Sequence, residues 1–128
     1  MVYVLEGSQD VQLTATASAT QVKRGDQVVL HVEQRTTGQW KQIPRSELTQ
    51  GQCWVYRPPV EVEAEVAHSV QWEVVPENSV EFHQEFQLDK SRVATMMTPG
   101  KITLTPITKV KCEEGRTVYG TPVEIQVE

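Results

Sequence analysis

The chain has 128 residues, of which 38% are hydrophobic, and its formal net charge at pH 7 is −5. This length is enough for one domain with a core of its own. The negative charge and the lack of a basic stripe argue against a nucleic-acid binder, because such proteins neutralise phosphates with clustered Lys and Arg. No apolar run reaches the roughly 20 residues that cross a bilayer, so membrane insertion is not expected.

Alternating polar and apolar residues predict strands along almost the whole chain, and helical periodicity is nearly absent. In chain order, the predicted strands fall at about 11–17, 28–32, 60–66, 70–74, 80–82, 102–104 and 118–127. Trp72 shares its face with Val70 and Val74 and is expected in the core. Pro106 has no backbone donor, so we expect its strand to bend, bulge or end there. Strands and turns at this spacing indicate a sandwich or a barrel.

Residues 34–59 depart from this alternation and are long for a connection between two strands. Connections of such length are usually functional or flexible. The segment holds three of the chain's few aromatic residues close to four basic ones: Trp40, Trp54 and Tyr56 with Arg35, Lys41, Arg45 and Arg57. We therefore expect a ligand site, if the chain has one, in this segment.

Two interpretations of these aromatic residues are open. Trp54 and Tyr56 are two positions apart, so on a strand they share one face. If that face is exposed, they form a flat stacking platform with Trp40 for a sugar or a partner protein, and Arg57 adds a charged contact. Otherwise Trp54 and Tyr56 belong to the core or cover the open end of the sandwich.

Two interpretations are also open for the cysteines, Cys53 and Cys112. Cys53 alternates with Val55 and Cys112 with Val110, so both side chains are expected to point into a core. A disulfide between them would close a long loop and restrict the unfolded chain. The alternative is two separate buried thiols that behave as small apolar residues. Two cysteines so far apart do not form a metal-binding motif.

The motifs of common hydrolase and nucleotide-binding sites do not occur in the sequence. His31, His68 and His83 fall on predicted solvent-facing strand positions or near a strand end, where a solvated histidine is expected. We therefore expect no catalytic residue and no cofactor. A small enzyme of unfamiliar type is the least favoured function.

The carboxylates give two further candidate sites. Glu61, Glu63 and Glu65 repeat at about 7 Å along one strand face, near the spacing of paired glycosidase acids. Exposed glutamates on an alternating strand are, however, typical of a solvated face that discourages edge pairing. A calcium site at loop ends is the second candidate, with oxygens from Glu77, Asn78 or Asp89, but no calcium-loop motif occurs. We expect no metal.

Several short motifs resemble those of bacterial immunoglobulin-like domains: residues 23–26 followed by VVLHV, Trp72 in VQWEVVP, residues 93–95, residues 98–100 followed by KITLT, and the terminal VEIQV. The resemblance implies an all-β, immunoglobulin-like antiparallel β-sandwich with an inserted segment at about 34–59. Alternatively, residues 60–66 are the second strand and residues 1–55 form a partly separate element. The family implies spacing, display and adhesion, with ligand binding in some members.

The resulting expectation is a single domain over residues 1–128, excised from a larger protein and located outside the cell or at its surface. Its function would be that of a non-catalytic structural or spacer module in a bacterial surface, secreted or phage structural protein, in contact with neighbouring domains. The alternative is a carbohydrate- or protein-binding module that uses the aromatic 34–59 segment. The first ten residues lack the basic start, apolar stretch and cleavage site of a signal peptide.

Overall fold

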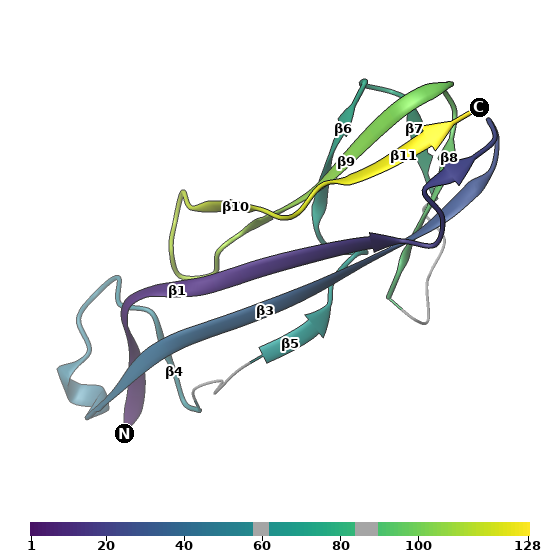
Figure 1. Cartoon of the computed structure of the whole chain (residues 1–128). Helices are drawn as coiled ribbons and strands as arrows, with labels where there is room; N and C mark the ends of the chain where they lie inside the picture. Colours follow the sequence, from purple (N-terminus) through teal and green to yellow (C-terminus); the bar gives the residue numbers. More distant parts are fainter. Residues whose placement is uncertain (58–61, 84–89) are drawn as a thin grey trace.

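The computed structural model describes residues 1–57, 62–83 and 90–128 and contains two β-sheets packed face to face (Figure 1). The N-terminal half holds β1 (Val2–Ala17), β2 (Gln21–Val22), β3 (Gln27–Ile43), the short 3-10 helix η1 (Arg45–Glu47), β4 (Trp54–Val55) and β5 (Val62–Glu65). The C-terminal half holds β6 (Gln71–Val75), β7 (Val80–Phe82), β8 (Arg92–Met96), β9 (Gly100–Lys109), β10 (Thr117–Tyr119) and β11 (Val123–Val127). The predicted all-β fold class is confirmed.

The strand order is that of an immunoglobulin-type sandwich. One sheet has the order β4-β1-β3-β8-β7, and β5 pairs with β3 on the edge that β8 also uses. In the other sheet β9 pairs with β6 on one edge and with β10 and β11 on the other edge. Strands β1, β3, β8 and β7 thus take the places of A, B, E and D, and β6, β9 and β11 those of C, F and G.

The core lies between the inward faces of the two sheets, as strand alternation requires. One cluster joins the buried side chains of β3, β8, β9 and β11, among them Leu30, Met96, Leu104 and Ile125. Trp72 on β6 packs against this cluster and against a second one around Leu13, Val32 and Ala67. Its indole Nε1 donates to the Ala67 carbonyl at 3.3 Å. Trp72 therefore packs on the core as predicted, with its one polar atom satisfied.

Pro106 does not interrupt its strand, contrary to the expectation from the sequence. β9 continues through Pro106 to Lys109, and Pro106 is fully buried opposite Trp72 of β6. On its other edge β9 pairs first with β11 and then with β10, and Pro106 lies where the neighbouring chain passes from one to the other. Its carbonyl accepts a hydrogen bond from Gly120 N at 2.8 Å. The N–H that Pro106 lacks would therefore fall between the β9–β11 pairing and the β9–β10 pairing.

β1 and β3 form a long two-stranded ribbon that extends beyond the sandwich (Figure 1). The segment expected to be irregular from residue 34 onwards is regular strand as far as Ile43, where β3 ends. Thr, Gln and Gly residues in this half of β3 hide the alternation, but pairing with β1 supplies its backbone hydrogen bonds. The N-terminus lies at the free end of the ribbon and the C-terminus at the opposite end of the molecule (Figure 1).

Candidate binding site at the free end of the ribbon

The free end of the ribbon is formed by residues 1–6 and 39–57, which we call the N-terminal pole. After β3 the chain turns at Pro44, whose φ of −62° and ψ of 141° start η1. Gln52 then closes a tight turn, because its side-chain oxygen accepts from Thr49 N at 2.8 Å. The returning chain adds β4 to the edge of β1, with Trp54 opposite Val4.

Trp54 and Tyr56 form a ring pair at this pole. Their ring centroids are 5.0 Å apart and their planes meet at 88°, an edge-to-face contact. Trp54 is half-buried, while Tyr56 is 61% exposed. The guanidinium of Arg45 lies over the Trp54 ring at 5.7 Å from its centroid, within cation–π range. The two rings lie together as predicted, but they form a corner rather than a flat platform.

Trp40 does not join this pair. It lies opposite Leu5 across the ribbon, whereas Trp54 lies opposite Val4, and successive residues of β1 point to opposite faces. Trp40 instead packs over Gly38, since a Cβ added at Gly38 would come within 3.3 Å of its Nε1. The two tryptophans therefore occupy opposite faces of the ribbon.

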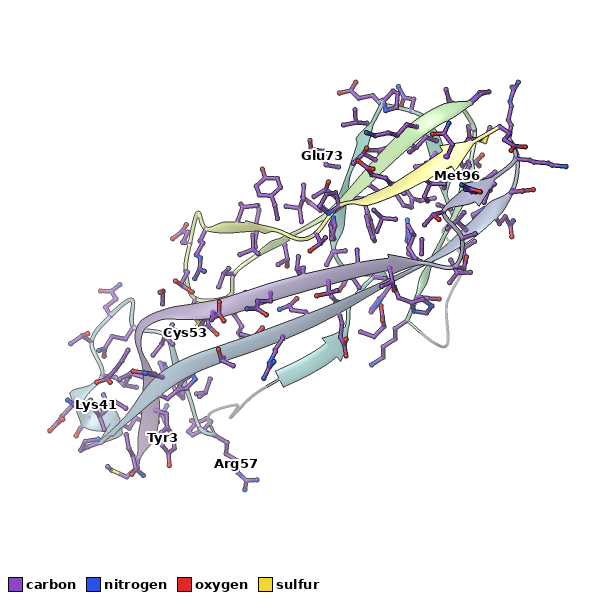
Figure 2. The ribbon with its side chains drawn as sticks, viewed as in Figure 1. Tyr3, Lys41, Cys53, Arg57, Glu73 and Met96 are labelled. Carbon is purple, nitrogen blue, oxygen red and sulfur yellow. A yellow bond between two sulfur atoms is a disulfide. The ribbon has the colours of Figure 1, made fainter. Side chains whose placement is uncertain are left out.

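Arg57 is exposed and directly follows Tyr56. Figure 2 shows its side chain extending away from the pole, with Lys41 and Tyr3 also placed at this end of the molecule. Lys41 lies opposite Val4 in the β1–β3 pair, so it shares the face of Trp54 two strands away. Neighbouring strands are about 4.8 Å apart, which places the backbones of Lys41 and Trp54 about 10 Å from each other.

A disulfide between Cys53 and Cys112 ties the pole to the turn after β9 (Figure 2). Of the two open interpretations, the structure therefore shows the bridge. The expected inward orientation is wrong for Cys112, which is exposed in a turn with a φ of 71°. The alternation with Val110 fails because β9 ends at Lys109, before the cysteine.

A polar cluster next to the disulfide holds the same turn against β1. Gln9 is buried, and its backbone N donates to Glu113 Oε2 at 3.1 Å while its side-chain amide donates to the Lys111 carbonyl at 2.7 Å. Arg116 donates to the Gln9 carbonyl at 2.7 Å and to both oxygens of Glu113 at 2.9 Å. The hydrogen bond from Gln9 and the Arg116 guanidinium lower the pKa of Glu113. We call Gln9, Glu113 and Arg116 the turn cluster.

Glu65 is a structural group rather than the solvated one that we expected. Its Oε1 accepts from Val32 N at 2.9 Å and from Ala67 N at 3.1 Å. It thereby fills the gap along β3 between the residues that pair with β8 and those that pair with β5. His31 Nδ1 lies 3.6 Å from the second oxygen of Glu65. Glu61 and the side chain of Glu63 lie outside the described residues.

The other histidines make local contacts. His68 is exposed, and its Nδ1 lies 3.1 Å from the Lys90 carbonyl. His83 Nε2 lies 2.7 Å from the Thr95 hydroxyl. No group of three or more His, Cys, Asp and Glu side chains suited to a metal ion occurs in residues 1–57, 62–83 and 90–128. Of the calcium candidates, Glu77 and Asn78 are exposed, and Asp89 lies outside the described residues.

The sequence interpretation missed two features of this pole: the position of Arg45 on Trp54, and the turn cluster. Pro44 was the available signal for Arg45, because it reverses the chain and brings the next residue back over the returning strand. No pattern links Gln9 to Glu113 and Arg116, more than 100 positions away.

In comparisons with known proteins, the chain matches no family model, no curated protein and no solved structure. The class of protein therefore comes from the fold alone: a mainly antiparallel β-sandwich with immunoglobulin-type strand order, a long β1–β3 ribbon and a disulfide at the ribbon's end. No helix in the described part of the chain is long and apolar enough to cross a membrane.

Proposed function

We propose that this chain is a non-catalytic structural module that spaces or displays neighbouring domains of a larger bacterial surface, secreted or phage structural protein. The observation that carries the proposal is the position of the two termini at opposite ends of an elongated molecule (Figure 1). β3 alone has 17 residues, which corresponds to about 55 Å of strand. Modules joined end to end would therefore add length at each repeat.

The disulfide supports a location outside the cell or at its surface. Disulfides form and persist in oxidising compartments and are rare in the cytosol. The Cys53–Cys112 bridge closes a long loop and holds the pole that projects from the sandwich. A protein exposed to proteases and shear gains from such a constraint, because the free end of the β1–β3 ribbon, with only the two-residue β4 beside it, is otherwise prone to fraying.

Small-angle X-ray scattering on a head-to-tail fusion of two copies tests this proposal. We expect the single chain to exceed the radius of gyration of about 14 Å that a compact globule of this length would have. The fusion should be longer than the single chain by about one module. A matched fusion with a long Gly/Ser linker shows how far flexible tethering alone extends the pair. Two copies that fold back side by side would contradict a spacer function.

A second candidate function, a binding module, is favoured by the Trp54–Tyr56 pair. Tyr56 leaves most of its ring in solvent next to a half-buried tryptophan and a stacked arginine. Exposed aromatic side chains beside arginine are typical of recognition surfaces, because they offer a large contact area at low entropic cost. Titration of the chain with glycans, followed by tryptophan fluorescence, tests this function.

A further inference from the structure

We propose that the N-terminal pole binds an acidic polysaccharide, one whose sugar rings carry carboxylate or sulfate groups. This inference rests on the binding function of the pole and adds the chemical class of its ligand. It depends on three features of the pole: its charge, the lack of carboxylate partners for its cations among the described residues, and the exposed ring of Tyr56.

The charge of the pole is opposite to that of the rest of the molecule. Residues 1–6 and 39–57 carry three basic side chains, Lys41, Arg45 and Arg57, against two acidic ones, Glu6 and Glu47. The remaining residues carry nine basic and fifteen acidic side chains. An anion approaching this acidic protein is therefore repelled by most of the surface and meets its excess of cations at the free end of the ribbon.

The three cations are exposed and available. Among the described residues, none of them forms an ion pair with Glu6, Glu47 or another carboxylate. Arg45 is held by the face of Trp54, a contact that orients the guanidinium without neutralising its charge. An oriented arginine binds carboxylate and sulfate well, because its planar fork of donors matches two oxygens at once.

The aromatic pair favours a sugar over an acidic polypeptide as the ligand. Tyr56 is 61% exposed, and its edge-to-face contact with Trp54 fixes the ring while leaving it open to solvent. A fixed aromatic face packs against the C–H face of a sugar ring, and nearby cations then reach the acidic substituents of that ring. A purely acidic peptide offers carboxylates to the cations but no flat ring to pack against the tyrosine.

Isothermal titration calorimetry on the full chain tests the proposal with polygalacturonate as the probe. Its fully methyl-esterified form is the neutral control, and poly-L-glutamate represents the acidic polypeptide. We expect the ester to bind at least about tenfold more weakly than polygalacturonate, which corresponds to about 1.4 kcal/mol of binding free energy. Binding of polygalacturonate should also weaken as salt is raised, since exposed charges are screened.

Matched variants locate the site. Replacing the two freely exposed cations together, Lys41→Gln with Arg57→Gln, should weaken binding of polygalacturonate at least about tenfold. The same change at the opposite end of the molecule, Lys23→Gln with Arg24→Gln, should leave the affinity for polygalacturonate unchanged. Tyr56→Ala should weaken binding while Tyr56→Phe retains it, because stacking needs the ring and not the hydroxyl. All variants should keep the denaturation midpoint of the parent chain.

Three results would overturn the inference. The first is that polygalacturonate does not bind even at low salt. The second is that the Lys23 and Arg24 pair matters as much as the Lys41 and Arg57 pair, which would mean diffuse attraction rather than a site. The third is that poly-L-glutamate binds as tightly as polygalacturonate and Tyr56→Ala has no effect, which would assign the pole to acidic polypeptides. None of them affects the scattering test of the spacer function.

Discussion

Removing the disulfide should cost this protein a large part of its stability. Cys53 and Cys112 are 59 positions apart in sequence. Closing a loop of this length in the unfolded chain corresponds to about 4 kcal/mol at 25 °C in the chain-entropy account. The folded state itself is little destabilised by the loss of the bridge, because the turn cluster of Gln9, Glu113 and Arg116 still holds the same turn against β1. We therefore expect Cys53→Ser with Cys112→Ser to fold and to be about 4 kcal/mol less stable.

Urea denaturation of the double variant and of the parent chain measures this difference. The parent chain in reductant is the matched control and should unfold at nearly the same urea concentration as the double variant. A loss below about 1 kcal/mol would refute the reasoning, because it lies well under the range typical of a long loop. Hydrogen exchange adds a second measurement: amides of residues 44–57 should exchange faster in the variant, since the pole loses its covalent tie.

Three further predictions concern single side chains. Glu65→Ala should cost about 1–3 kcal/mol, because two backbone donors lose their acceptor, whereas Glu65→Gln, which keeps an oxygen, should cost clearly less in the same urea melts. The pKa of Glu113 is lowered in the folded state, so its carboxylate stabilises the protein above the ordinary value of 4.5. The difference in unfolding free energy between the parent chain and Glu113→Gln should therefore be present near pH 7 and disappear as the pH falls through the lowered pKa. A difference that grows on acidification would contradict the hydrogen bonds assigned to Glu113 in the turn cluster. Trp72→Ala should cost about 3–5 kcal/mol and Trp54→Ala less, since Trp72, unlike Trp54, packs on both core clusters, and equal losses would show that the pole is as well packed as the sandwich.

The fold class could be predicted because strand alternation is a local signal. Val28, Leu30 and Val32 point inward on β3, and Val123, Ile125 and Val127 do so on β11, as their spacing indicates. The far half of β3 gave no such signal. There the ribbon has no second sheet over it, so an apolar residue at every second position is not needed to fill a core, and pairing with β1 keeps the strand extended.

The candidate site could be predicted only in part. Spacing correctly placed Trp54 beside Tyr56, since the two residues belong to one short stretch. Trp40 lies on another strand, and its face relative to Trp54 depends on how β1 pairs with both β3 and β4. The prediction that Cys112 points inward failed for a related reason, because side chains alternate between the two faces only as far as the strand extends. Contacts between segments far apart in the chain therefore could not be predicted from the spacing of residues.

A register break in β1 separates the pole from the rest of the ribbon. Between Glu6 and Asp10, β1 advances four residues while β3 advances two, from Gln39 to Thr37. The excess is an even number, so each strand keeps the same side chains on the same face beyond the break. Gly7, with a φ of 71°, lies in this break. We expect that changing the length of this break by two residues would change the angle between the pole and the sandwich without turning the ribbon over. One scaffold could in this way present its terminal surface at several angles.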